Sequence, residues 1–122
     1  MEKRVLVIED EPNISEALRF ILTREGWRVE VSADGHAMLG QMQADPPDLV
    51  ILDLMLPGLS GFDILKTLRA IDLTRELPVL MLTAKGQGAD RAEAERLGVT
   101  RFMTKPFANA EVIAAVREMT AS

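Results

Sequence analysis

An α/β fold, with helices on both faces of a mostly parallel five-stranded sheet, is the architecture that the sequence predicts. Short apolar runs alternate with segments whose apolar residues recur at helical spacing, and the pair repeats five times with short connections. The chain has 122 residues, of which 48% are hydrophobic and 27% charged. This length and composition are typical of one globular domain with its own core.

The predicted strands are five short segments, at residues 5–8, 29–31, 49–52, 78–82 and 100–103. Val5-Leu6-Val7-Ile8 is apolar throughout, as expected for a strand that is covered on both faces. Val29-Glu30-Val31 is short, and we expect it at an edge of the sheet. Pro78 opens the fourth segment, where a missing N–H group is tolerated.

Helical periodicity marks the segments between the strands. Pro12 suits the first turn of the first helix, and Gly26 is a suitable residue to end it. Gly40 weakens the second helix by about 1 kcal/mol relative to alanine. The third helix follows Gly61. The fourth helix, over residues 87–97, has a thin apolar side that consists of Ala89, Ala92 and Leu97. The fifth helix has a fuller apolar side, with Val112, Ile113, Val116 and Met119.

Composition excludes several classes of function. The chain contains no cysteine, so it has neither disulfides nor thiolate metal sites. The net charge is −5, with scattered Lys and Arg, one Trp and no Tyr, which argues against direct binding of nucleic acid by this domain. We find no signal peptide and no membrane-spanning stretch, and we therefore expect a cytoplasmic protein.

Polar residues follow each central strand at the point where it ends. Glu9-Asp10 follows the first predicted strand, Asp53 the third, Thr83 the fourth and Lys105 the fifth. Because the carboxyl ends of parallel strands meet at one edge of a sheet, we expect these side chains to converge there.

This set of residues suits phosphoryl transfer. Three neighbouring carboxylates repel one another, and a hard divalent ion such as Mg²⁺ relieves the repulsion. His and Cys are absent from these positions, which argues against zinc. Asp53 can then act as a nucleophile toward phosphorus, with Lys105 and the Thr83 hydroxyl or the Ala84 N–H neutralising the phosphoryl oxygens.

Four stretches, VLVIEDEP, DLVILDLMLPGLSGFD, PVLMLTA and FMTKPF, resemble the receiver domain of two-component response regulators, in the family's order and spacing. The resemblance covers essentially the whole chain, so residues 1–122 are expected to form one receiver domain. It implies a flavodoxin-like (βα)5 fold with strand order 2-1-3-4-5. The implied function is a signalling switch that is phosphorylated by a sensor histidine kinase or a histidine phosphotransfer protein and acts on an output domain or partner.

The resemblance also implies a role for each site residue. Asp53 is the implied phosphoacceptor. Mg²⁺ would be bound directly by Asp10, through water by Glu9, and by the backbone carbonyl of Met55. Lys105 would pair with the phosphoryl group, and the peptide bond from Lys105 to Pro106 would be cis. Thr83 would be the switch hydroxyl and Phe102 the switch aromatic. We expect phosphorylation to remodel the face formed by the fourth helix, the fifth strand and the fifth helix.

Two positions depart from the family pattern. Many DNA-binding response regulators dimerise through that face with an acidic residue just before the switch aromatic and an arginine in the last helix. Here these positions are Arg101 and Ala115, so we expect that particular dimer not to form. Glu11, next to the acidic pair, is expected to be merely solvated.

Three alternative functions come from other classes. A phosphatase with an aspartyl phosphate intermediate needs a second acid two residues after the nucleophile, where this chain has Met55. A flavin carrier needs a loop rich in Thr, Ser and Gly after the first strand, where residues 9–11 are acidic and would repel phosphate. A degenerate receiver that only docks proteins is the third, and it is disfavoured because every residue type of the site is present.

Overall fold

The computed structural model describes residues 3–84 and 88–121. In this part of the chain, the strands are β1 (Arg4–Ile8), β2 (Arg28–Ser32), β3 (Leu49–Asp53), β4 (Val79–Thr83) and β5 (Arg101–Thr104). The helices are α1 (Pro12–Arg24), α2 (Gly35–Ala44), α3 (Gly61–Ala70), α4 (Gly88–Arg96) and α5 (Asn109–Thr120), with a short 3₁₀ turn, η1 (Asp72–Thr74), that the sequence pattern did not predict.

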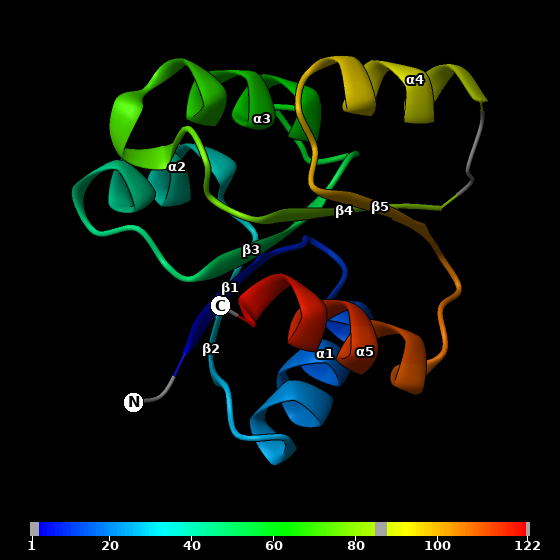
Figure 1. The fold of residues 1–122 in the computed structure, drawn as a ribbon. Helices are drawn as coiled ribbons and strands as arrows, with labels where there is room; N and C mark the ends of the chain where they lie inside the picture. Colours follow the sequence, from blue (N-terminus) through cyan, green and yellow to red (C-terminus); the bar gives the residue numbers. More distant parts are fainter. Residues whose placement is uncertain (1–2, 85–87, 122) are drawn as a thin grey trace.

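The strands form one parallel sheet in the order β2-β1-β3-β4-β5. Helices α2, α3 and α4 cover one face, and α1 and α5 cover the other (Figure 1). The predicted fold class and strand order are therefore confirmed, with β2 at an edge. None of the helices among the described residues combines the length and apolar character needed to cross a membrane.

Two apolar cores, one on each side of the sheet, hold the layers together. All five residues of β3 and of β4 are buried, because these central strands are covered on both faces. Successive side chains point to opposite faces, so Leu6 and Ile8 belong to the core under α2, α3 and α4. Val5 and Val7 belong to the core under α1 and α5.

Local signals place the helix ends. Gly26 adopts a φ of +104° after α1, a conformation that glycine adopts without strain. The hydroxyl of Ser60 accepts a hydrogen bond from the N–H of Asp63 at 3.2 Å and so caps α3. Asp34 caps α2 in the same way, accepting from the N–H of Ala37 at 3.0 Å.

Helix α4 buries a different side from the one expected. Ala94 is fully buried and Leu97 packs partly against the core, whereas Ala89 and Ala92 are exposed. The prediction that Ala89 and Ala92 lie on the side of this helix that faces the core was wrong. Residue 94 is rotated by about 200° from residue 92 around a helix, so burial of Ala94 turns Ala92 toward solvent. Residue 87, where the sequence pattern begins this helix, lies outside the described residues.

Arg69 of α3 joins the end of α4 to the rest of this layer. Its guanidinium donates hydrogen bonds to the carbonyl oxygens of Gly98 at 2.8 Å and Thr74 at 3.3 Å, and to Oγ1 of Thr100 at 3.4 Å. Burial lowers the pKa of the Arg69 guanidinium from its ordinary value. The segment that follows α4 is thus fastened to α3 through Gly98 and Thr100.

Candidate functional site

The carboxyl ends of β1, β3, β4 and β5 bring polar side chains to one edge of the sheet. Asp53 is the last residue of β3 and pairs in register with Leu82, next to Thr83 at the end of β4. The backbone N–H of Lys105 donates to the carbonyl oxygen of Thr83 at 2.6 Å, which places Lys105 beside the same edge. Strand order and register therefore assemble residues that are far apart in the sequence.

Lys105 lies at the centre of this cluster. Its Nζ is 2.8 Å from Oε1 of Glu9 and 3.2 Å from Oδ1 of Asp53, and all three side chains are almost entirely shielded from solvent. Burial by itself lowers the pKa of Lys105, but the hydrogen-bonded and charged neighbours Glu9 and Asp53 outweigh it, so the pKa is raised above its ordinary value. The ammonium is therefore charged at neutral pH.

Glu9 is buried with part of its hydrogen-bonding capacity unused. Its Oε2 accepts a hydrogen bond from the backbone N–H of Glu11 at 3.1 Å. Its Oε1 faces the Lys105 ammonium but accepts no well-directed hydrogen bond from the residues that the structure describes. Burial raises the pKa of Glu9, with a smaller contribution from the charge of Asp53, and Lys105 and the Glu11 N–H oppose this effect.

The acidic residues are close enough to share one cation. One carboxylate oxygen from each of Glu9, Asp10 and Asp53 lies within 4.8 Å of the other two. The three carboxylates carry three negative charges against the single positive charge of Lys105. The excess of two negative charges and the all-oxygen ligand set fit a hard divalent cation such as Mg²⁺.

The loop after β3 is shaped by a glycine that allows close approach. A Cβ atom on Gly61 would lie 2.6 Å from the carbonyl oxygen of Asp53 and 2.9 Å from Cα of Leu54, too close for any other residue. Helix α3 can therefore begin directly against the end of β3. The side chain of Met55 in this loop is 72% exposed.

Thr83 and Phe102 lie on the same face of the sheet. Phe102 pairs in register with Met81, and both belong to the core under α2, α3 and α4; Thr83 follows Met81 by two residues and shares its face. Thr83 is buried, and Phe102 is only 8% exposed. The guanidinium of Arg91 in α4 lies 5.1 Å from the centre of the Phe102 ring and covers it from outside.

Three further observations bear on the sequence-based predictions. The Lys105–Pro106 peptide bond is cis, as the resemblance implies. Arg101 forms an ion pair with Glu118 of α5, with nitrogen–oxygen distances of 3.3 and 3.4 Å, which the sequence pattern did not predict. Oε1 of Glu11 lies 3.5 Å from Nζ of Lys105, so the expectation that Glu11 is merely solvated was incomplete.

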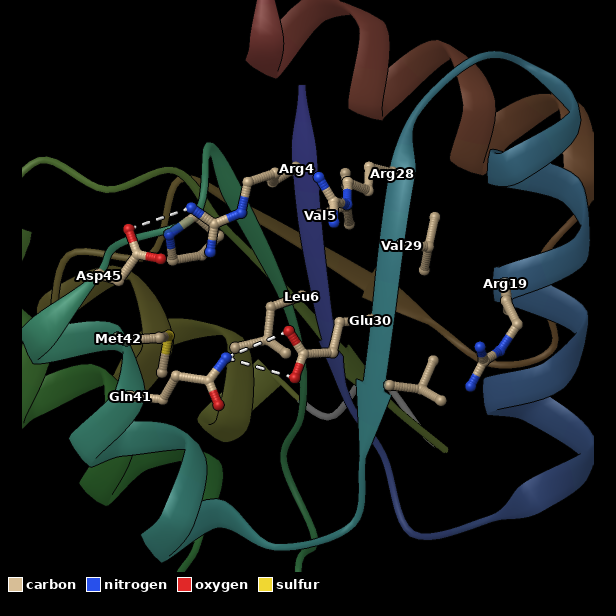
Figure 2. A pocket seen from close by; sticks show the side chains of 12 residues that line it. Arg4, Val5, Leu6, Arg19, Arg28, Val29, Glu30, Gln41, Met42 and Asp45 are labelled. Atoms are coloured by element: carbon tan, nitrogen blue, oxygen red, sulfur yellow. Dashed lines mark hydrogen bonds and ion pairs between the residues drawn. The ribbon is translucent and has the colours of Figure 1, made fainter. Parts of the chain in front are cut away.

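A separate cavity of about 300 Å³ lies along β2, away from this site (Figure 2). Four of its polar side chains form two pairs: Arg4 pairs with Asp45 at 3.2 Å, and the Gln41 amide donates to both carboxylate oxygens of Glu30 at 3.1 and 3.3 Å. Among the described residues that line it, none belongs to the acidic cluster.

Comparison with known sequences places the chain among signalling proteins. Residues 5–117 match the sequence profile of the response regulator receiver domain. The phosphate regulon transcriptional regulatory protein PhoB of Escherichia coli K12 is 38% identical over 117 residues, which cover 96% of this chain and 51% of PhoB. The sensory transduction protein RegX3 of Mycobacterium tuberculosis H37Rv is 41% identical over 113 residues, which cover 93% of this chain and 48% of RegX3. The chain thus spans about half the length of these relatives.

Solved structures share the fold over the whole chain. The receiver domain of the sensor histidine kinase PA1611 from Pseudomonas aeruginosa PAO1 has a TM-score of 0.91 at 27% identity, covering all of both chains. That structure has a magnesium ion coordinated in its active-site cleft. The chemotaxis protein CheY4 of Vibrio cholerae has a TM-score of 0.90 at 27% identity, covering 98% of this chain and 99% of CheY4.

Proposed function

The chain belongs to the response regulator receiver domain family, and on this premise we propose that Asp53 accepts a phosphoryl group from a histidine kinase or a histidine phosphotransfer protein. We further propose that residues 1–122 act as one receiver domain. The observation that carries the proposal is the position of Asp53: a buried carboxylate at the end of β3, 3.2 Å from the Lys105 ammonium and grouped with Glu9 and Asp10.

The proposed step uses the side chains at the edge of the sheet. A carboxylate oxygen of Asp53 attacks phosphorus, the P–N bond of the phosphohistidine breaks, and its electron pair returns to the imidazole nitrogen. Lys105, which is charged at neutral pH, would pair with a phosphoryl oxygen, and the Thr83 hydroxyl would donate a hydrogen bond to another. The raised pKa of Lys105 supports its assignment as a fixed positive charge.

The acidic cluster supports a role for Mg²⁺. The carboxylates of Glu9, Asp10 and Asp53, together with the backbone carbonyl of Met55, would hold the ion. When bound, it would neutralise negative charge on the phosphoryl group. The excess negative charge of the acidic cluster supports this assignment, and the magnesium ion in the PA1611 receiver domain is consistent with it.

We propose a signalling switch and not a phosphatase as the outcome of this chemistry. Receiver domains are signalling switches as a class. Met55 stands where a phosphatase of this chemistry would need an acid, and its side chain cannot transfer a proton. Thr83 and Phe102, on the same face of neighbouring strands, are proposed to pass the change at Asp53 to the face formed by α4, β5 and α5, and from there to an output segment or partner protein. A purely docking receiver is not favoured, because the acidic cluster and Lys105 are assembled.

Intact mass spectrometry after incubation with acetyl phosphate and Mg²⁺ tests the proposal. We expect an added mass of about 80 Da, one phosphoryl group. The Asp53→Asn variant should lack this adduct, and the Asp72→Asn variant, which changes an exposed aspartate in η1, should form it at the wild-type rate. An adduct that survives Asp53→Asn, or no adduct on the wild-type chain, would contradict the assignment.

A further inference from the structure

We propose that Glu11 makes this site discriminate between phosphodonors by the charge of the leaving group. Donors whose phosphorus is bonded to a protonated nitrogen are favoured, and acyl phosphates, whose leaving group is a carboxylate, are disfavoured. This inference rests on the proposed function, since it concerns the same reaction at Asp53.

Glu11 carries a negative charge at the solvent side of the site. Its Oε1 is 3.5 Å from Nζ of Lys105, the ammonium that also contacts Asp53. Unlike the buried Glu9 and Asp53, the Glu11 side chain is 61% exposed. A donor that brings its phosphoryl group to Lys105 from solvent therefore meets the Glu11 carboxylate close to the reacting centre.

Beside Lys105 there is room for a leaving group. A cavity of about 450 Å³ opens there, and its lining includes the polar side chains of Glu11, Asn13 and Lys105 and apolar groups of Ile14, Pro106 and Phe107. A small leaving group that enters it is within reach of the Glu11 charge. At separations of about 4 to 8 Å, one unit charge changes a binding constant or a rate constant by about two- to fivefold even in water.

The two donor classes differ in the charge that Glu11 meets. With phosphoramidate, the P–N bond breaks, the Asp53 oxygen–phosphorus bond forms, and the nitrogen, already protonated, leaves as ammonia. With acetyl phosphate, the P–O bond breaks and acetate leaves with the electron pair as an anion. The Glu11 carboxylate attracts the protonated nitrogen of the first donor and repels the developing carboxylate of the second. Both reactions balance without a further reactant.

The Glu11 side chain pairs with Lys105 but does not cap α1. Glu11 precedes α1 at the N-cap position, but its side chain makes no capping hydrogen bond. The hydrogen bond to Glu9 comes from the backbone N–H of Glu11, which a substitution to glutamine preserves. The variant Glu11→Gln therefore removes the charge and keeps the fold.

The experiment measures the initial rates of Asp53 phosphorylation by acetyl phosphate and by phosphoramidate, each with Mg²⁺, by intact mass. The readout is the ratio of the two rates. In Glu11→Gln, we expect the ratio of acetyl phosphate to phosphoramidate to rise about three- to tenfold over wild type. High salt should raise the wild-type ratio toward that of the variant, because an exposed charge is screened.

Glu16→Gln is the matched control. Glu16 is 62% exposed, about as much as Glu11, but its ion pair at 3.5 Å is with Arg19 on the outer side of α1. Its substitution should leave the ratio unchanged. An unchanged ratio in Glu11→Gln, or an equal rise in Glu16→Gln, would overturn the role of Glu11 and leave the proposed function intact. If neither donor modifies wild-type Asp53, the proposed function fails, and this inference with it.

Discussion

Nζ of Lys105 lies 3.2 Å from Oδ1 of Asp53, although 52 positions separate the two residues in the sequence. The same ammonium is 2.8 Å from Oε1 of Glu9. One positive charge thus balances two buried carboxylates that follow different strands, and the ends of β1, β3 and β5 are tied together by it.

Removing the Lys105 charge should destabilise the metal-free domain. In Lys105→Met, the aliphatic part of the side chain is kept, but two buried carboxylates lose their counter-charge. We expect the free energy of unfolding at pH 7 to fall by about 3 kcal/mol, measured by urea denaturation. Lys66→Met, on the exposed side of α3, should change it by less than about 0.5 kcal/mol. Equal effects of the two substitutions would show that the buried ion pairs carry no stability.

The stability contributed by Glu9 should depend on pH. Folding raises the pKa of Glu9 above its ordinary value of 4.5, so the native state binds the proton more tightly than the unfolded state. The contribution of Glu9 is therefore fully present below pH 4.5 and is lost as pH rises through its folded pKa. As pH rises from 4 to 7 in buffers with a metal chelator, the free energy of unfolding of Glu9→Gln should increase relative to that of wild type. Urea denaturation midpoints at each pH measure this difference. A stability difference that does not change over this range would refute the raised pKa.

Two glycines should respond to alanine in opposite directions. Gly61→Ala places a Cβ atom within 3 Å of the backbone at Asp53 and Leu54, and should cost about 2 kcal/mol or more and slow phosphorylation of Asp53. Gly40→Ala lies in the interior of α2, where a Cβ atom meets nothing within 4 Å, and should raise the free energy of unfolding by about 0.5–1 kcal/mol. Thermal and urea unfolding of both variants measure this contrast, and changes of the same sign would contradict it.

Arg91 should restrain the Phe102 ring. Because the guanidinium covers the ring at 5.1 Å, Arg91→Ala should cost about 0.5–1 kcal/mol and increase the mobility of the ring, which NMR relaxation of aromatic carbons would detect. Arg96→Ala is the control on the same helix, since the Arg96 guanidinium pairs with Glu93. Ring dynamics that are identical in wild type and Arg91→Ala would exclude this restraint.

Part of the site could be predicted because its signal is local. Glu9, Asp53 and Thr83 each stand at the end of an apolar run, and in a parallel sheet such positions share one edge. Their convergence follows from strand order and needs no knowledge of side-chain conformation. The buried side of α4 was predicted less well, because its apolar side chains are three alanines, which leave little contrast between its faces.

The fold class, the strand order and the residues at the sheet edge therefore follow from patterns along the chain, namely periodicity, strand-end polar residues and family motifs. Other contacts could be read only from the packed structure: Glu11 beside Lys105, Arg91 over Phe102, and Arg101 paired with Glu118. Each joins a long, flexible side chain to a residue of another element or loop. Which partner such a side chain reaches depends on how the helices pack against the sheet. No local pattern of residues encodes the distance between the two side chains in the folded domain.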